Sequence, residues 1–286
     1  MSVEPVVKQD LETAYDQTKW APNMYHILAR YAFLSDATRA VVGCPNSFSY
    51  GEEKQESLHV YKVKKRRAPI VIFVHGGGWR GGSTAECAFP AEMLHAAGVH
   101  FIAVDFSTIA EAKGDLGILV NQIRRAFGWI FQNSARFGGD PHRLYIVGHS
   151  SGAHLAAMTL STCWPDYGLP SDLIKGGVLV SGIYDLGPLR QTSRVAYVHI
   201  DDRVEHELSP IHQLSNLSAP LLIAVGTAES PEFRRQSQSY AEAAMKAGKK
   251  IQTIVGEGYN HFEILETLAN PYGILGRNIL KLLGEK

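Results

Sequence analysis

The feature that most constrains this chain is the stretch LYIVGHSSGAHL, from Leu144 to Leu155. Its first four residues are apolar and three of them favour strands, whereas the residues from Leu155 onward follow a helical pattern. The intervening Gly148-His149-Ser150-Ser151-Gly152 is therefore predicted to be a tight turn from strand to helix, with Ser150 at its apex. The two glycines have a mechanical reason, because side chains there would crowd the strand and helix around a strained serine.

The evidence that Ser150 is an active-site residue comes from the segments around it rather than from its pentapeptide motif alone. A G-x-S-x-G pentapeptide arises by chance about one time in six in a chain of this composition, and the alternative is a simple Gly/Ser turn before a buried helix. Here a strand and a helix flank it, and a second motif, His75-Gly76-Gly77-Gly78, follows the apolar run Pro69–Val74. Such a run is typical of a strand buried on both faces of a parallel sheet. The two motifs together predict an active-site serine.

Composition limits the class of protein. The chain has 286 residues, of which 45% are hydrophobic, and this fits one large α/β domain over residues 1–286. The 28 Lys and Arg residues equal the 28 Asp and Glu residues, which argues against nucleic acid or an anionic membrane as the main partner. No apolar run approaches the roughly 18 residues of a membrane-spanning helix. The oligomeric state stays open, with a homodimer as one form.

The N-terminus and the cysteines bear on location. The chain begins MSVEPVVKQDLETAYD, which is polar and acidic, unlike a secretory signal peptide. The three cysteines, Cys44, Cys87 and Cys163, are an odd number without metal-ligand spacing, so we expect reduced thiols. These observations favour a cytoplasmic protein.

The rest of the chain alternates predicted strands with predicted helices, which indicates a parallel sheet covered on both faces. Residues 10–42 have a helical pattern broken at Pro22-Asn23, so we expect residues 1–45 to form a helical flap packed on the body. The basic run Lys64–Arg67 is expected to be a solvated turn. Besides the strand before Ser150, strands are predicted at 55–63, 69–74, 100–106, 177–181, 221–225 and 251–255, and helices at 85–97, 116–133, 232–247 and from 262 onward.

A serine hydroxyl needs a base, and the base needs an orienting acid. His261 follows the predicted strand 251–255 and is the only histidine after His212, which makes it the expected base. Glu229 follows the strand 221–225 and is the expected acid, with Asp185, one strand earlier, as its rival. Hydrolysis should fail at acidic pH, because an imidazolium cannot accept the serine proton.

The glycine loop is predicted to hold the developing oxyanion. Consecutive glycines let backbone N–H groups turn inward, so the amides of Gly77 and Gly78 together with that of Ser151 form the expected oxyanion hole. His75 is expected to pin this loop by a hydrogen bond. The acidic and histidine-rich residues 199–207 match no standard metal spacing and are predicted to be a surface loop, so we expect neither a metal nor a cofactor.

At this point the sequence resembles the arylformamidases (kynurenine formamidases) of the α/β-hydrolase fold over almost its whole length. His75-Gly76-Gly77-Gly78-Trp79 is similar to the H-G-G-x-W motif of that family, with Trp79 as the distinguishing residue. Two stretches depart from the pattern: Ser151 and Ala153 replace Ala and Gly, and 105–110 lacks Tyr-x-Leu-x-Pro. The other similar segments are 11–15, 20–23, 137–141, 148–155, 181–186, 229–237 and 260–262.

The resemblance implies a serine hydrolase that cleaves an aryl formamide or small acyl amide, such as N-formylkynurenine, through an acyl-enzyme. The alternatives are a carboxylesterase for aryl or short-chain esters, or a hydrolase-fold binding protein. The partner expected in each enzymatic case is a small-molecule substrate. Trp79 is expected to wall the acyl side of the site, and Trp20 and Tyr25, with Tyr31, the aryl side, unless these aromatic residues only bury the flap.

Overall fold

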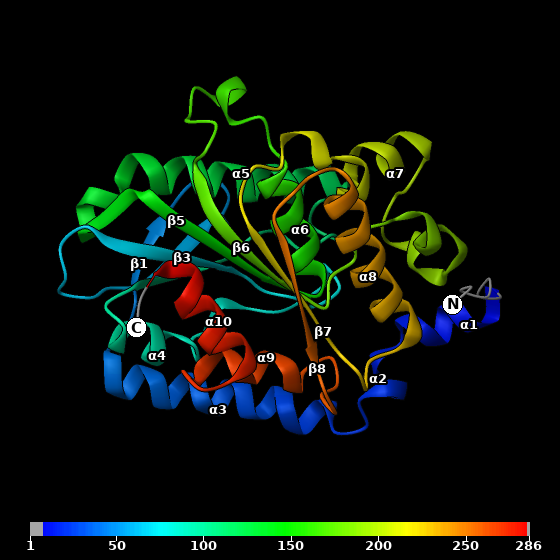
Figure 1. The fold of residues 1–286 in the computed structure, drawn as a ribbon, viewed down its shortest axis with the longest axis horizontal. Helices are drawn as coiled ribbons and strands as arrows, with labels where there is room; N and C mark the ends of the chain where they lie inside the picture. Colours follow the sequence, from blue (N-terminus) through cyan, green and yellow to red (C-terminus); the bar gives the residue numbers. More distant parts are fainter. Residues whose placement is uncertain (1–7, 285–286) are drawn as a thin grey trace.

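The apolar run predicted to be a buried strand forms β3, whose seven residues are all buried. In this computed structural model, which describes residues 8–284, β3 lies inside an eight-stranded sheet of order β1-β2-β4-β3-β5-β6-β7-β8 (Figure 1). β2 pairs antiparallel with β1 and β4, and the other neighbours are parallel. The strands are β1 (Asn46–Ser49), β2 (Ser57–Tyr61), β3 (Ala68–Val74), β4 (His100–Val104), β5 (Gly139–His149), β6 (Ile174–Val180), β7 (Leu221–Gly226) and β8 (Ile251–Gly256).

Helices cover both faces of this sheet, as predicted (Figure 1). Alternate residues of β3 serve the two cores, because successive side chains of a strand point to opposite faces. Within residues 8–284, no helix is long and apolar enough to cross a membrane. One face packs against α5 (Leu116–Asn133), α6 (Ser151–Leu160) and α8 (Pro231–Lys246), and the other against α3 (Met24–Val42), α4 (Ala91–Ala96), α9 (Glu263–Glu266) and α10 (Ile274–Leu283).

The helix predicted at 85–97 is shorter than expected. A 3₁₀ turn at Thr84–Glu86 comes first, and α4 begins only at Ala91, immediately after Pro90. Proline has no N–H to donate and disfavours helical geometry in the residue before it, so the helix starts after Pro90.

The segment predicted to be a surface loop at 199–207 contains a short helix, α7 (Asp202–Leu208). Asp201 caps it, with its side chain accepting a hydrogen bond from the Val204 N–H at 2.7 Å. Asp202 and Glu205 form ion pairs with Arg190, so the acidic residues of this segment serve a local surface contact.

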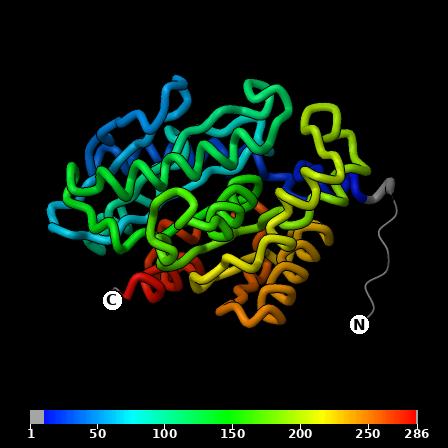
Figure 2. The backbone as a smooth tube through the Cα atoms, turned by 90° about the horizontal axis from the view of Figure 1, so that it is seen from above, coloured from blue at the N-terminus to red at the C-terminus, as the bar shows by residue number. Residues whose placement is uncertain are grey.

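The N-terminal segment, which also includes α1 (Lys8–Tyr15) and α2 (Gln17–Trp20), takes part in both cores. Leu11 and Tyr15 join the core that contains α5 and α6, whereas Ile27 and Tyr31 join the opposite one. The Tyr31 hydroxyl donates a hydrogen bond to the Phe262 carbonyl at 2.5 Å. Figures 1 and 2 place α1 at the end of the molecule that carries α7, away from α10. Removing this segment would therefore expose core residues on both faces.

The close approach of α6 to β3 depends on Gly152. A Cβ atom there would lie 2.2 Å from the Val74 carbonyl oxygen and 2.3 Å from that of His75, and both are backbone atoms that cannot rotate away. We expect Gly152→Ala to lower the free energy of unfolding by about 1–3 kcal/mol, measured by urea denaturation.

Gly128→Ala is the matched control, because Gly128 lies inside α5 and its added Cβ would meet only Leu169, at 3.6 Å. This control should leave stability unchanged or raise it by up to about 1 kcal/mol, since alanine favours helix more than glycine does. Equal stability of both variants would contradict the packing argument.

Candidate active site

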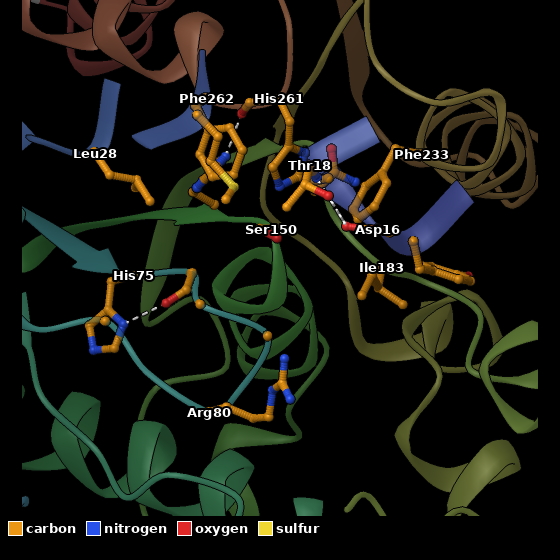
Figure 3. Close-up of a pocket in the computed structure, with 18 of the residues that line it drawn as sticks. Asp16, Thr18, Leu28, His75, Arg80, Ser150, Ile183, Phe233, His261 and Phe262 are labelled. Carbon is orange, nitrogen blue, oxygen red and sulfur yellow. Dashed lines mark hydrogen bonds between the residues drawn. The ribbon is translucent and has the colours of Figure 1, made fainter. Parts of the chain in front are cut away.

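Ser150 occupies the strained turn that its sequence context predicts. Its backbone has φ 56° and ψ −124°, a region that residues other than glycine rarely adopt. The Ser150 N–H donates to the Val180 carbonyl at 2.9 Å, and a Cβ on Gly148 would lie only 2.5 Å from the Gly152 carbonyl oxygen. The turn between β5 and α6 thus holds Ser150 on the wall of a cavity of about 710 Å³ (Figure 3).

The predicted acid and base are in contact. Glu229 follows β7 and His261 follows β8, so the parallel strands bring both to the same sheet edge as Ser150. His261 Nδ1 lies 2.8 Å from Glu229 Oε2, and the two side chains are almost completely buried. A carboxylate accepts, so Nδ1 carries the proton and Nε2 is left as the proton acceptor of a neutral ring. His261 lines the same cavity as Ser150.

Glu229 is held by two further donors. Its Oε1 accepts the Ser181 hydroxyl at 2.6 Å and the Gly226 N–H at 2.7 Å. Ser181 is fully buried and has φ 53°, so the backbone itself turns to aim this hydroxyl. These donors fix the carboxylate plane with Oε2 toward His261. Ser181 has no sequence signal of its own, because its role arises only when β6 and β7 lie side by side.

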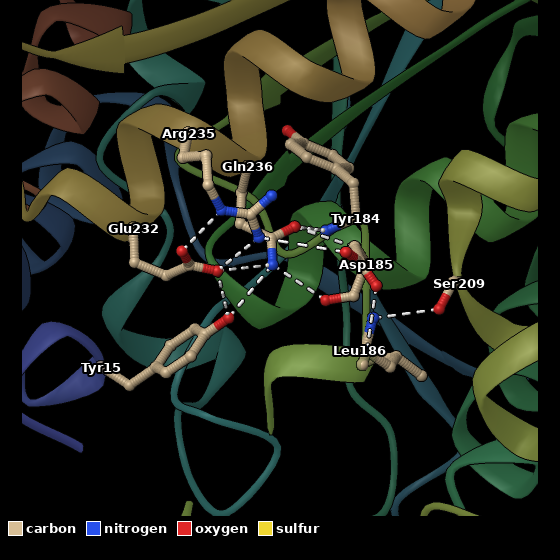
Figure 4. A network of polar contacts seen from close by, with 9 residues as sticks. Tyr15, Tyr184, Asp185, Leu186, Ser209, Glu232, Arg235 and Gln236 are labelled. Carbon is tan, nitrogen blue, oxygen red and sulfur yellow. Dashed lines mark hydrogen bonds and ion pairs between the residues drawn. The ribbon is translucent and has the colours of Figure 1, made fainter. Parts of the chain in front are cut away.

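Asp185, the rival for the acid, belongs to a different network (Figure 4). Its Oδ1 accepts a hydrogen bond from the Gly187 N–H at 3.0 Å, and its Oδ2 lies 3.9 Å from Arg235 Nη2. Gln236 Oε1 accepts the backbone N–H of Asp185 at 2.9 Å. Asp185 therefore organises the loop after β6 and stands outside the carboxylate–histidine contact.

The glycine loop after β3 faces the cavity. Gly77, Gly78 and Trp79 have φ values of 120°, 62° and 60°, a run of three residues with positive φ that the glycines make possible. Gly77 and Gly78 line the cavity beside Ser150. The loop is pinned to α6, because the Trp79 N–H donates to Ser151 Oγ at 3.2 Å. His75 adds a hydrogen bond from Nδ1 to the Gly76 carbonyl at 2.9 Å.

His149 lines the cavity but is not placed to act as the base. Its Nε2 donates to the His261 carbonyl at 2.8 Å, and the two rings lie 4.8 Å apart. Burial, with the nearby His261, lowers the pKa of His149 to about 3, so the ring stays neutral at ordinary pH. His149 supports the segment that carries His261.

Of the four residues expected to bind substrate, Tyr25 and Tyr31 line the cavity, whereas Trp79 and Trp20 lie elsewhere. Trp79 is buried in the core with its indole edge-on to His154 at 5.3 Å, because the left-handed backbone turns it toward α6. Trp20 is outside the cavity lining and donates from its indole to the Thr13 carbonyl at 3.1 Å. Tyr25 does line the cavity and is 73% exposed.

Aromatic residues that the sequence analysis did not single out form much of the cavity wall. Phe233 lies in the first turn of α8 and its ring is 4.6 Å from that of His261. Phe262 follows His261 directly, and Tyr197 comes from the segment before α7. In the sequence, the position of Phe233 close after Glu229 and of Phe262 directly after His261 was the only indication of a place in the cavity wall. Nothing in the sequence around Tyr197 indicated such a place.

This arrangement of a strained serine, a buried carboxylate–histidine pair and a glycine loop on a mostly parallel sheet defines an α/β-hydrolase. A family model described as alpha/beta hydrolase fold matches residues 71–265, and the chain is a hydrolase of this class. The crystal structure of esterase LipW from Mycobacterium marinum has the same fold, with a TM-score of 0.71 at 18% identity over 98% of this chain and 96% of that chain.

The relatives narrow the class. The kynurenine formamidase of Danio rerio is 36% identical over 291 residues, which cover 97% of each chain. The kynurenine formamidase of Salmo salar is 33% identical, again with 97% of each chain covered. The chain therefore belongs to the kynurenine formamidase (arylformamidase) family of α/β-hydrolases, as the H-G-G-x-W resemblance implied.

We expect Ser181→Ala to lower kcat about tenfold or more with KM little changed, because it removes a buried hydrogen bond to a carboxylate without touching the cavity. Steady-state kinetics measure kcat and KM separately. Ser237→Ala is the matched control, since Ser237 is also buried but its hydroxyl has no hydrogen-bond partner in the part of the chain described. If Ser181→Ala and Ser237→Ala had the same kcat, Ser181 would have no positioning role.

Proposed function

We propose that this protein hydrolyses aryl formamides of the N-formylkynurenine type, with Ser150, His261 and Glu229 as nucleophile, base and acid. The observation that carries the proposal is the cavity itself: Ser150 and His261, whose ring is held by the buried Glu229, line one space together with the rings of Phe233 and Phe262. Flat apolar rings suit an aromatic leaving group. The kynurenine formamidase relatives support the same substrate class.

The geometry supports a two-step reaction. Ser150 Oγ attacks the formyl carbon while His261 Nε2 takes its proton, and the amides of Gly77, Gly78 and Ser151 stabilise the oxyanion. The C–N bond then breaks, His261 gives the proton to the departing aniline nitrogen, and a formyl-serine ester remains. Water, deprotonated by His261, attacks this ester and releases formate. Glu229 holds the imidazole in one orientation throughout.

One observation favours the esterase alternative. A formyl carbon carries only hydrogen, so a dedicated formamidase should close the acyl side of its site, and Trp79 was the expected wall. Its indole lies in the core instead, outside the cavity lining. Trp79 therefore does not restrict the acyl group to formyl, which is compatible with a larger acyl group such as the acetyl of an ester.

The three free cysteines support a reducing compartment as the place of action. None of Cys44, Cys87 and Cys163 forms a disulfide in the described chain. Burial raises the pKa of the Cys87 thiol, which keeps it protonated and unreactive. The cytoplasm is the compartment that we propose.

A comparison of N-formylkynurenine with p-nitrophenyl acetate tests the function. We expect turnover of the formamide, and Ser150→Ala should reduce it to a few per cent or less, since triad members act as a unit. Glu229→Gln should lower kcat far more than Asp185→Asn. Asp185→Asn is the control, because it makes the same change from carboxylate to carboxamide at a residue that does not contact His261. Turnover of the ester alone would establish the esterase alternative, and a larger loss in Asp185→Asn would refute the acid assignment.

Tyr25 offers a test of aryl selectivity. It is 73% exposed and lines the cavity, so Tyr25→Ala should remove an aromatic face without disturbing the core. We expect KM for N-formylkynurenine to rise several-fold more than KM for p-nitrophenyl acetate. Trp20→Ala is the control, because Trp20 comes from the same segment but lies outside the cavity lining. An equal rise of both KM values in Tyr25→Ala would mean that Tyr25 contributes no selectivity.

A further inference from the structure

Two arginines of the cavity are held against one tyrosine. The Arg80 guanidinium stacks over the Tyr197 ring, with Cζ 4.6 Å from the ring centroid. Arg194 Nη1 donates to the Tyr197 hydroxyl at 2.8 Å, and its Nη2 donates to the Tyr15 carbonyl at 2.7 Å. Both arginines line the same cavity as Ser150. Tyr197 thus gathers two positive charges at one place in the cavity wall.

Neither guanidinium makes a close ion pair. Within residues 11–284, whose side chains the structure describes, no carboxylate lies within ion-pair distance of Arg80 or Arg194, although Arg194 is half-buried. Glu12 and Asp16 attract Arg194 only from a longer distance. Arg235 and Arg190, by contrast, do make close ion pairs: Arg235 makes two 2.7 Å bonds to Glu232, and Arg190 contacts two acidic residues. Two guanidiniums that contact the same tyrosine repel each other, so an anion that reaches both would be stabilised by both.

The pair lies close to the reaction centre. Arg194 Nη1 is 3.7 Å from the position that a Cβ on Gly78 would take, which sets it beside the glycine loop. Figure 3 shows Arg80 extending toward Ser150 from the side opposite His261. A carboxylate held by the two arginines would therefore belong to the molecule whose formamide reaches Ser150.

The cavity also carries negative charge. Glu12, Asp16 and Glu86 are its acidic lining residues. Glu12 is engaged by Ser193, and one oxygen of Asp16 accepts hydrogen bonds from Thr18. Glu12 and Asp16 lie close enough to Arg194 to attract it, and a cavity that carries both signs of charge fits a zwitterion better than a simple anion.

We propose that Arg80 and Arg194 form a carboxylate subsite that selects aryl formamides bearing an amino-acid side arm. This inference rests on the proposed function and assigns the residues that distinguish such a substrate from a simple aryl formamide. The fork of each guanidinium matches a carboxylate, which makes arginine more selective here than lysine.

The test uses two formamides that differ only in the carboxylate, N-formylkynurenine and N-formylkynuramine. In Arg80→Gln and Arg194→Gln, the ratio of kcat/KM for the first to that for the second should fall about ten- to hundredfold, through KM. Arg190→Gln is the control, because Arg190 pairs with surface carboxylates outside the cavity, and its ratio should match that of the unmodified enzyme.

The possible outcomes distinguish a failure of the carboxylate subsite from a failure of the proposed function. A fall in kcat for both formamides with an unchanged ratio would overturn the subsite and show that Arg194 acts on the oxyanion beside Gly78. If the unmodified enzyme hydrolyses neither formamide, the proposed function fails. The subsite is then tested with two esters, phenyl acetate and 3-(2-acetoxyphenyl)propanoate, of which only the second carries a carboxylate. A higher kcat/KM for the second ester in the unmodified enzyme, lost in both arginine variants, supports the subsite. Equal kcat/KM values for the two esters in the unmodified enzyme overturn it.

Discussion

The active site depends first on how closely β5, α6 and β3 approach one another. Gly148 and Gly152 permit this approach, because a Cβ on either would meet backbone atoms at 2.2–2.7 Å. The same packing holds Ser150 in its left-handed conformation and brings Ser151 Oγ to the Trp79 N–H. One packing constraint therefore positions both the proposed nucleophile and the loop that is proposed to stabilise the oxyanion.

The histidine and its acid depend on supports from distant parts of the chain. Ser181 at the end of β6 orients Glu229, and Asn23, between α2 and α3, accepts a hydrogen bond from Asn260, the neighbour of His261. Tyr15 of α1 donates to Glu232 in the first turn of α8, which starts just after Glu229 (Figure 4). The N-terminal segment thus contacts residues next to Glu229 and His261 and also lines the cavity, so its loss would affect stability and, on the proposed function, kcat as well.

Sequence patterns were sufficient where local chemistry decides the structure. The helix predicted at 116–133 has those bounds, and β7 and β8 lie within one residue of their predictions, because each is a strongly patterned element. The Ser150 turn and the Glu229–His261 contact followed from motif order. β1 was not predicted, since Asn46–Ser49 is a polar edge strand with one partner. The placement of Trp79 failed because a single left-handed φ redirects its side chain.

The residues that sequence could not find share one property: their roles arise from the meeting of separate segments. Ser181 contacts Glu229 from the neighbouring strand, and Tyr197, three residues after Arg194, meets Arg80 from the glycine loop. The catalytic chemistry is carried by short motifs that α/β-hydrolases of different substrate ranges have in common, so it cannot distinguish an ester from a formamide. Selectivity must come from the cavity wall, where the two arginines, which make no close ion pair, form the proposed contact for a substrate carboxylate.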